Sequence, residues 1–334
     1  MILLTGATGY LGSQIAAELV GRGEPFRVLV RDASRLGFDP GNAKCELVVG
    51  DLRDAKATAR ALAGVKQVIH TAALVKMWVR DPRDFWRVNV EGLKNLLSAA
   101  AGAGVDKVVY TSSFIALGPN SNANAGEDLR HGETSSNEYE QTKAEALAWL
   151  RGEGFRRFPV VALMPGVIYG PGPATEGNLV GGMITQYAAG NFPGILGLGE
   201  QRWSFAYNSD VVAAHFAALE KGKPGEAYVL GGDNRSLNEF FSALAEISGI
   251  HRTVRHLPFI AGKMVGGVEV LRARLFGRQP QLTPGVVEVF KHDWVYSSAK
   301  AVRELAYHVT PLEEGLRKTL DIERQKPQKA LPSR

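Results

Sequence analysis

The sequence has few of the features that mark secreted, metal-binding or membrane-spanning proteins. Its 334 residues include one cysteine, Cys45, so no disulfide can form within the chain and no thiolate cluster can hold a metal. No pattern of metal-ligand spacing is visible, and we predict no metal site. No run reaches the ~18 apolar residues of a bilayer-spanning helix. Because an apolar strand already begins at Ile2, we expect no signal peptide and a cytoplasmic location.

Nucleic-acid binding is also disfavoured by the distribution of charge. The formal net charge is +5 and the pI is about 9.2, but no basic run is interleaved with aromatic residues, so we expect no nucleic-acid partner. The charge is compatible with an anionic cofactor. A hydrophobic share of 45% over this length supplies a full core for one large domain and a smaller lobe.

Glycines are regularly spaced near the N-terminus. The segment Thr5–Gly12 follows a short apolar strand and precedes a helix-periodic stretch. There Gly6 permits a tight turn, Gly9 lets backbone N–H groups approach a pyrophosphate, and Gly12 allows the helix to pack closely on the strand. The helix N-terminus would attract the same anion. This order of strand, glycine turn and helix predicts a dinucleotide-binding site.

A second motif lies near the middle of the chain. Tyr139 and Lys143 are four residues apart on a predicted helix, so their side chains share one face. An ammonium group and an oxidised nicotinamide would both favour the phenolate, which lets Tyr139 exchange a proton near neutral pH. The pair alone is common on solvated helix faces. Combined with the upstream glycine motif, it indicates hydride-transfer chemistry.

Strand and helix patterns alternate through the first half of the chain. They predict an α/β fold with a doubly wound parallel Rossmann sheet. Ser236–Glu239 forms a capping-box pattern at the start of a late helix, and Gly249 is its predicted stop. The predicted strands after the first are Arg27–Val30, Glu46–Val49, Gln67–His70, Lys107–Tyr110 and Val160–Met164.

The composition of the sequence changes after Met164, where segments rich in Gly and Pro begin. We therefore predict a Rossmann domain over 1–165, with late sheet elements also from about 203–234. A smaller, discontinuous C-terminal lobe over 166–202 and 235–324 would bind the substrate. The polar tail 325–334 is expected to be frayed.

Along nearly its whole length the chain resembles the extended short-chain dehydrogenase/reductases. Within that family it is most similar to the dihydroflavonol-reductase, 3β-hydroxysteroid-dehydrogenase and farnesol-dehydrogenase branch. The resemblance implies an NAD(P)-dependent alcohol dehydrogenase or carbonyl reductase that forms a homodimer through the helices around 84–103 and 138–153. It is carried by Thr5–Gly12, Gly50–Leu52, His70–Ala73, Val88–Gly92, Tyr110–Ser113, Tyr139–Lys143 and Pro165–Gly172.

The same resemblance implies roles for individual residues. Tyr139 would be the general acid/base, Lys143 would bind the nicotinamide ribose and lower the pKa of Tyr139, and Ser113 would hydrogen-bond the substrate oxygen. Ser112 is the competing choice for that serine. The implied cofactor-binding residues are Gly6, Thr8, Gly9, Tyr10, Leu11, Gly12, Arg31, Asp51, Leu52, Thr71, Ala72, Ala73, Asn89, Tyr139, Lys143, Pro165 and Val167.

The end of the second strand bears on cofactor choice. NAD-specific Rossmann proteins place an acid there for the ribose 2′-OH, whereas this chain has Arg31, which can bind a 2′-phosphate, with Arg35 nearby. This favours NADP(H); NAD(H) stays possible because Asp32 follows directly and the resembling branch uses NAD. Asp51 would meet the adenine, and Asn89 would brace the neighbouring loop or make an internal helix contact.

Substrate identity is less constrained, because variable loops build the pocket. Apolar residues suggest a lipophilic alcohol or carbonyl compound of isoprenoid, sterol or flavonoid type, although core packing explains each one equally simply. The alternative is a nucleotide-sugar epimerase or dehydratase with tightly bound NAD; Arg202 lies one place too early for its usual diphosphate contact. A non-catalytic dinucleotide sensor is disfavoured by the intact Tyr/Lys pair. The apolar candidates are Val75, Met77, Trp78, Phe114, Ile168, Tyr169, Met183, Trp203 and Phe205.

Two further features have competing interpretations. The segment 258–277 is apolar but carries Lys263, Arg272 and Arg274, so it could cover the pocket or rest on a membrane surface; we favour pocket cover. His215 is interpreted as a packed helix residue rather than a catalyst.

Overall fold

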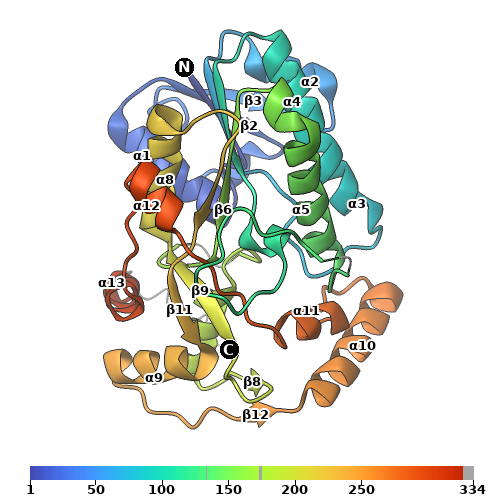
Figure 1. Ribbon diagram of the computed structural model, residues 1–334, viewed down its shortest axis with the longest axis vertical. Coiled ribbons are helices and arrows are strands. Elements are labelled where there is room, and N and C mark those ends of the chain that lie inside the picture. The colour runs from blue at the N-terminus through green and yellow to red at the C-terminus, as the bar shows by residue number, and fades with distance from the viewer. Residues whose placement is uncertain (133, 173–174, 326–334) are drawn as a thin grey trace.

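Seven short apolar segments form one parallel sheet in the computed structural model, which describes residues 1–132, 134–172 and 175–325 (Figure 1). Parallel strands are buried on both faces, which is why these segments read as continuous apolar runs. The predicted doubly wound sheet is confirmed, and each predicted strand is present to within one residue at either end. In sheet order the strands are β10 (Ala227–Leu230), β6 (Val160–Pro165), β5 (Lys107–Thr111), β4 (Gln67–His70), β1 (Ile2–Thr5), β2 (Phe26–Val30) and β3 (Cys45–Val49).

The register of the central strands aligns their carboxyl ends. Thr5 at the end of β1 pairs with His70 at the end of β4, and His70 pairs with Tyr110 of β5. Ligands in open α/β sheets bind beyond this edge. The glycine turn after β1 and the serines after β5 are therefore brought to the same edge of the sheet.

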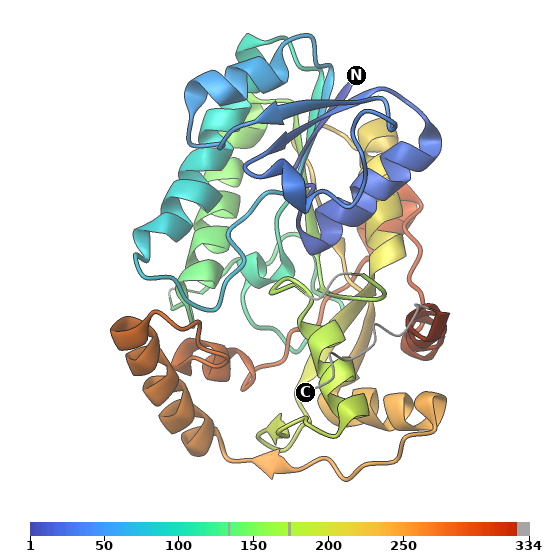
Figure 2. The ribbon, with the colours of Figure 1, turned by 180° about the vertical axis from the view of Figure 1, so that it is seen from behind.

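Helices cover both faces of the sheet, as the two opposite views show (Figures 1 and 2). Alternate strand residues pack into two separate cores: Leu3 and Val108 belong to one, and Leu4 and Val109 to the other. One face carries α1 (Tyr10–Arg22), α8 (Asn208–Lys221) and α12 (Ala299–Leu305). The other carries α2 (Ala55–Leu62), α3 (Arg83–Trp86), α4 (Gly92–Gly102), α5 (Glu138–Trp149) and the short α6 (Phe155–Arg157).

The rest of the chain forms two small sheets and their helices below the main sheet in Figure 1. Of the late segment, only β10 joins the main sheet. The three-stranded sheet is β11 (Asp233–Ser236), β9 (Arg202–Tyr207) and β7 (Val167–Tyr169), and the two-stranded sheet is β12 (His256–Leu257) and β8 (Ile195–Leu196). The helices are α7 (Leu179–Ala189), α9 (Leu237–Ser248), α10 (Phe259–Phe276), α11 (Pro284–Val289) and α13 (Leu312–Gln325).

Local signals at α9 are confirmed in atomic detail. The Ser236 hydroxyl accepts a hydrogen bond from the backbone N–H of Glu239, whose carboxylate accepts one from the Ser236 N–H, and Gly249 ends the helix in the left-handed conformation at φ 70°. The domain boundaries stay a prediction. Apart from Gln325, the predicted frayed tail 325–334 lies outside the described residues.

The expected cover over the pocket is not formed by the large side chains of segment 258–277. Helix α10 fully buries only Gly262, Gly266 and Ala273, and its large apolar side chains apart from the partly buried Phe259 and Val270 are exposed. The reason is steric, since a Cβ atom added at Gly262 would lie 2.7 Å from Leu196 and one at Gly266 would lie 2.9 Å from Thr283.

Candidate active site

The turn between β1 and α1 depends on glycine at two positions. Gly6 has a φ of +83°, and a Cβ atom there would lie 2.5 Å from Oγ1 of Thr71. A Cβ atom at Gly12 would lie 2.0 Å from the carbonyl oxygen of Gly6. The Gly9 N–H donates to that same oxygen across 2.9 Å and closes the turn. The predicted tight turn and close helix–strand packing are both present.

This turn fits the pyrophosphate of a dinucleotide. Helix α1 begins at Tyr10 after Gly9, whose backbone is extended, and it has no side-chain cap and no acidic residue in its first turn. The first N–H groups of a helix need an acceptor, and an anion supplies one. The predicted contacts Tyr10 and Leu11 are buried, and Thr8 is half-buried. The Tyr10 hydroxyl donates to the Gly170 carbonyl at 2.9 Å, which ties a second loop to this helix.

Ser113 and Tyr139 meet beyond the carboxyl end of β5. Ser113 follows β5 after one intervening residue, Ser112. Its hydroxyl oxygen accepts a hydrogen bond from the Ile115 N–H at the start of a 3₁₀ turn. Tyr139 lies in the first turn of α5, which Asn137 caps by accepting from the Glu140 N–H at 2.9 Å. The Ser113 side chain lies close enough to Tyr139 to favour the ionised form of its phenol.

Ser112, the competing serine, is buried beside Tyr110. Its hydroxyl has no hydrogen-bond partner among the described residues. Ser113, whose side chain affects the pKa of Tyr139, therefore stays the predicted catalytic serine.

Lys143 is held against the same strand end. Its side chain is 1% exposed, and its Nζ donates to the Thr111 carbonyl oxygen at 3.1 Å and to the Tyr110 hydroxyl at 3.4 Å. The Nζ lies 6.0 Å from the centre of the Tyr139 ring. Burial lowers the pKa of Lys143 to about 7, so its charged and neutral forms are nearly balanced at neutral pH.

The pKa of Tyr139 moves in the direction opposite to the expectation. Burial raises the pKa of Tyr139 to about 12, and the nearby Ser113 side chain opposes this only in part. The Lys143 ammonium does not offset the burial, because it is directed to Thr111 and is itself partly deprotonated. In this form of the enzyme the phenol is protonated at neutral pH and can act as a proton donor.

A buried histidine adjoins this group. Nδ1 of His70 lies 2.7 Å from the Thr5 hydroxyl, and its ring stacks on Tyr110 with ring centres 5.7 Å apart. Burial, with the charge of Lys143 in second place, lowers the pKa of His70 to about 3, so the ring is neutral. Thr71 then donates to the Thr5 carbonyl at 2.8 Å. The sequence analysis did not assign His70 to the site. Its position at the start of the His70–Ala73 motif was the feature that could have indicated it.

The Asn89 side chain braces the loop that follows β4. Its Oδ1 accepts from the Leu74 N–H at 2.8 Å, and its Nδ2 donates to the Leu74 carbonyl at 3.3 Å and to the Thr142 hydroxyl at 3.1 Å. Asn89 thereby ties the loop after β4 to the residue before Lys143. It lies in a π-helical turn over 87–91, a distortion found often at functional sites and not foreseen from the sequence.

The end of β2 presents Arg31 to solvent. Asp32 is occupied locally, since its carboxylate accepts from the backbone N–H and the hydroxyl of Ser34 at 3.0 and 2.6 Å. Asp51 pairs with Arg53 at 2.9 Å, and that hydrogen bond, with a smaller contribution from Arg31, lowers the Asp51 pKa. The sequence analysis did not include Arg53, whose basic side chain four places after the end of β3 was the only clue.

The remaining predicted cofactor residues lie along the same edge of the sheet. Ala72 and Ala73 follow β4 after Thr71 and are partly buried. Pro165 ends β6 and Val167 begins β7. Leu52 is only 9% exposed and belongs to the core beneath the edge.

The apolar candidates separate into core and surface groups. Val75 is 39% exposed, and Met77, Trp78 and Ile168 are partly buried. Trp203 packs on Phe290 with ring centres 4.6 Å apart, which is ordinary core packing. The members that belong to the core are Phe114, Tyr169, Met183, Trp203 and Phe205.

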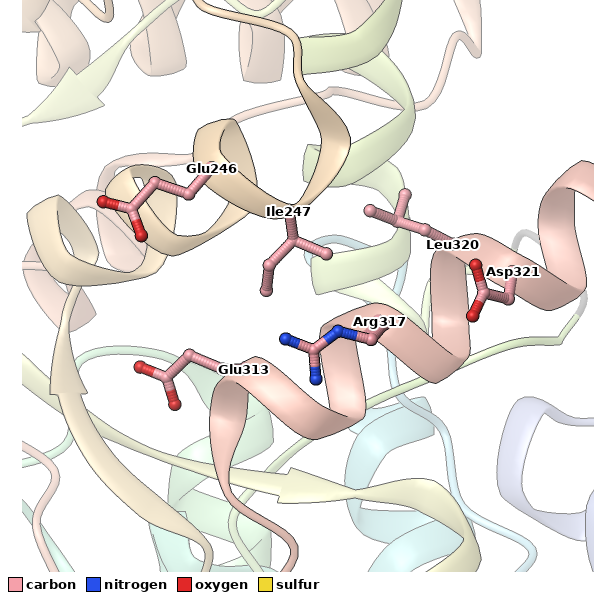
Figure 3. Close-up of a pocket in the computed structure, with 6 residues that line it drawn as sticks. All are labelled: Glu246, Ile247, Glu313, Arg317, Leu320 and Asp321. Carbon is pink, nitrogen blue, oxygen red and sulfur yellow. The ribbon is translucent and has the colours of Figure 1, made fainter.

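A hollow of about 520 Å³ lies elsewhere, between α9 and α13 (Figure 3). Figure 3 shows side chains of the two helices facing one another across it. None of the predicted catalytic residues lines this hollow. The candidate active site lies instead at the carboxyl edge of the main sheet. The lining residues are Glu246, Ile247, Glu313, Arg317, Leu320 and Asp321.

Comparisons with known proteins place this site in a family. The model of the NAD dependent epimerase/dehydratase family matches residues 2–231. The chain is 33% identical over 287 residues to sterol demethylase protein B of Methylococcus capsulatus, covering 84% of each protein. It is 28% identical to a 3-beta-hydroxysteroid dehydrogenase of Mycolicibacterium neoaurum, covering 92% of this chain and 86% of that one.

Solved structures agree with this fold. The crystal structure of gox2253 matches with a TM-score of 0.78 and 35% identity, covering 97% of this chain and 98% of that one. The dTDP-glucose 4,6-dehydratase DesIV of Streptomyces venezuelae, solved with NAD, has a similar fold with a TM-score of 0.77 at 24% identity, covering 98% and 97% of the two chains. With the glycine turn and the Ser113–Tyr139–Lys143 group, these matches show that the chain belongs to the NAD-dependent epimerase/dehydratase family of extended short-chain dehydrogenase/reductases and is an NAD(P)-dependent oxidoreductase.

Proposed function

We propose that the enzyme interconverts a lipophilic alcohol, of isoprenoid, sterol or flavonoid-like type, and its carbonyl compound. The observation that carries the proposal is the grouping of Tyr139 and Lys143 beyond β5, where the Lys143 Nζ lies 6.0 Å from the centre of the Tyr139 ring. The Ser113 side chain lies close enough to Tyr139 to affect its pKa. Lys143 is buried against the same strand end. Relatives named for sterol and steroid chemistry match over 84% and 92% of the chain, and they support the class of substrate.

The bound nicotinamide would supply or accept the hydride at the substrate carbon. For reduction, Tyr139 donates its phenolic proton to the carbonyl oxygen, and for oxidation the phenolate accepts the proton of the alcohol. Ser113 holds the same oxygen by a hydrogen bond. Lys143, fixed by the Thr111 carbonyl, stabilises the phenolate while it exists.

We propose NADP(H) as the preferred cofactor, with NAD(H) as the alternative. Arg31 is exposed at the end of β2, and no described residue forms a hydrogen bond or ion pair with its guanidinium group. Asp32 is engaged with Ser34, so a 2′-phosphate would meet a cation with free donors. Paired charge-assisted hydrogen bonds from arginine suit that group.

A nucleotide-sugar substrate is the second candidate, supported by the family match. Its diphosphate would require a cation near β9. Arg202 is exposed at the start of β9, and its guanidinium donates to the Ser121 carbonyl at 3.2 Å. Trp203 and Phe205, which follow it, are core residues. These contacts favour the lipophilic substrate.

We also propose a cytoplasmic homodimer that pairs through α4 and α5 with their flanking turns, around 84–103 and 138–153. Light scattering coupled to gel filtration tests this assembly, and a monomer at micromolar concentration would contradict it.

The substrate assay follows nicotinamide absorbance with NADP and NAD separately. Farnesol, a 3β-hydroxysteroid and a dihydroflavonol with reduced cofactor are compared beside a UDP-hexose epimerisation assay. We expect turnover of at least one lipophilic compound and a lower KM for NADP(H). Epimerisation without net cofactor change would replace the proposal with the sugar-nucleotide alternative.

A further inference from the structure

Helix α10 has the reverse of the usual amphipathic arrangement. It is 18 residues long and lies at the edge of the molecule in both views (Figures 1 and 2). A surface helix normally turns its large apolar side chains to the core. Here the fully buried positions are Gly262, Gly266 and Ala273, with Phe259 and Val270 partly buried, and the other large apolar side chains are exposed. They are 50–72% exposed: Ile260, Met264, Val265, Val268, Leu271, Leu275 and Phe276.

Five of these seven side chains, those of Ile260, Met264, Val268, Leu271 and Leu275, form one continuous stripe. At 3.6 residues per turn they fall within roughly 80° of the circumference, Arg272 separates them from Val265 and Phe276, and the helix is roughly 27 Å long. The three buried positions fall within roughly 40° on the opposite side. Isolated exposed apolar residues are ordinary, but a contiguous patch of this kind marks an interaction surface.

The charge around the stripe is positive. Residues 259–278 contain four Lys or Arg and one acid, Glu269, a formal net charge of +3 (4 − 1). Glu269 is 3.5 Å from Arg272, and Glu288 of α11 is 2.8 Å from Lys263. Arg274 and Arg278 are exposed on the same segment. The surface is thus apolar in the middle and cationic at its margins.

We propose that α10 docks this protein on the surface of an anionic lipid bilayer, lying in the plane of the interface. Its stripe would enter the boundary between headgroups and acyl chains, and its Lys and Arg side chains would meet the anionic headgroups. No helix among the described residues is long and apolar enough to cross a bilayer, so the contact is peripheral.

A second copy of the chain fits this surface less well. A two-fold contact places the same patch on both partners. The cationic margins of one α10 would then face those of the other, and like charges across an interface disfavour association. An anionic surface neutralises those margins.

The docked helix would be linked to the catalytic helix through α11. Helix α10 packs on α11, and a Cβ atom added at Gly285 of α11 would lie 2.5 Å from the Ser136 carbonyl and 3.0 Å from Asn137, the cap of α5. A lipophilic substrate dissolved in the membrane would thus be near Tyr139. The docking inference itself does not depend on the substrate class.

Vesicle flotation with the full chain tests the inference. The probes are vesicles of phosphatidylcholine alone and of phosphatidylcholine mixed with phosphatidylglycerol. We expect the wild type to float with the mixed vesicles, and less with phosphatidylcholine alone or at high salt. The double variant Leu271→Gln/Leu275→Gln should lower the bound fraction at least about tenfold, because both side chains are 57–67% exposed and their loss does not disturb the core.

Two further variants separate the causes. Arg274→Gln should weaken binding to mixed vesicles only and reduce its salt dependence. Val302→Gln, at a 48% exposed apolar position on α12, is the matched control and should bind as the wild type does. Unfolding curves verify that all variants are folded.

Three outcomes would overturn the inference: no flotation of the wild type, equal loss in the Val302→Gln control, or lipid-independent oligomers that the double variant dissolves. The last result would identify a second copy of the chain as the occupant.

Discussion

Replacing Gly12 by Ala tests whether the turn after β1 tolerates any side chain. The new Cβ would lie 2.0 Å from the Gly6 carbonyl oxygen and 2.6 Å from its carbon, both of them backbone atoms. Contacts below 3.0 Å do not occur, so the turn must open by about 1 Å. Overpacking of this kind costs about 3 kcal/mol, and alanine returns about 1 kcal/mol as a better helix former. We expect a net loss of about 2 kcal/mol.

Gly21→Ala is the matched control in the same helix. Nothing lies within 4 Å of a Cβ atom at Gly21, so only the helix preference changes and stability should rise by about 0.5–1 kcal/mol. Urea unfolding followed by tryptophan fluorescence measures both variants. Dinucleotide affinity should fall at least about tenfold in Gly12→Ala, equivalent to ~1.4 kcal/mol, and stay unchanged in Gly21→Ala. If the two variants behave alike, the close approach of Gly6 and Gly12 does not shape the cofactor site.

Three further predictions concern the site. Tyr139→Phe should abolish turnover and preserve cofactor binding, whereas Tyr187→Phe, remote on α7, should keep turnover; residual activity in the first would refute the proton-transfer role. Arg31→Ala should raise the Kd of NADPH about tenfold or more and that of NADH little, and equal losses would contradict NADP(H) preference. Burial lowers the Lys143 pKa from 10.5 to about 7, so between these values the unfolded chain binds more protons and stability rises with pH. Lys143→Met should remove up to about 1.4 kcal/mol of that rise per pH unit, measured by urea unfolding at several pH values; an unchanged slope would contradict the shift.

The features predictable from sequence were those that a few neighbouring residues determine. The fourth strand, Gln67–His70, was predicted with its observed bounds from its β-branched pair Val68–Ile69, which suits a buried strand. The capping box at Ser236 was equally local. Gly6 and Gly12 were readable because the absence of a side chain has a direct steric meaning.

Features decided by distant partners were not predictable in the same way. Trp203 was a candidate for the substrate pocket, but its ring packs on Phe290, far along the chain. Phe205 stacks on Phe240 at 5.1 Å for the same reason. Both faces of α10 are visible in its sequence, yet which one turns inward depends on the space beside Leu196. Likewise, the raised pKa of Tyr139 follows from burial, which the Tyr/Lys spacing does not encode.

The position of Lys143 is set from the far face of the sheet. His215 on α8 is fully buried, and its Nδ1 lies 2.7 Å from the Val211 carbonyl, so that nitrogen carries the proton and donates. Its Nε2, 2.8 Å from the Thr111 hydroxyl, must then accept from it. Thr111 is thus fixed by a helix on one face while its carbonyl accepts from Lys143 on the other. Burial lowers the His215 pKa to about 4, which keeps the ring neutral and this chain of hydrogen bonds intact through the pH range in which Lys143 titrates. The histidine is therefore a packed helix residue, as expected, and its packing positions the lysine beside Tyr139.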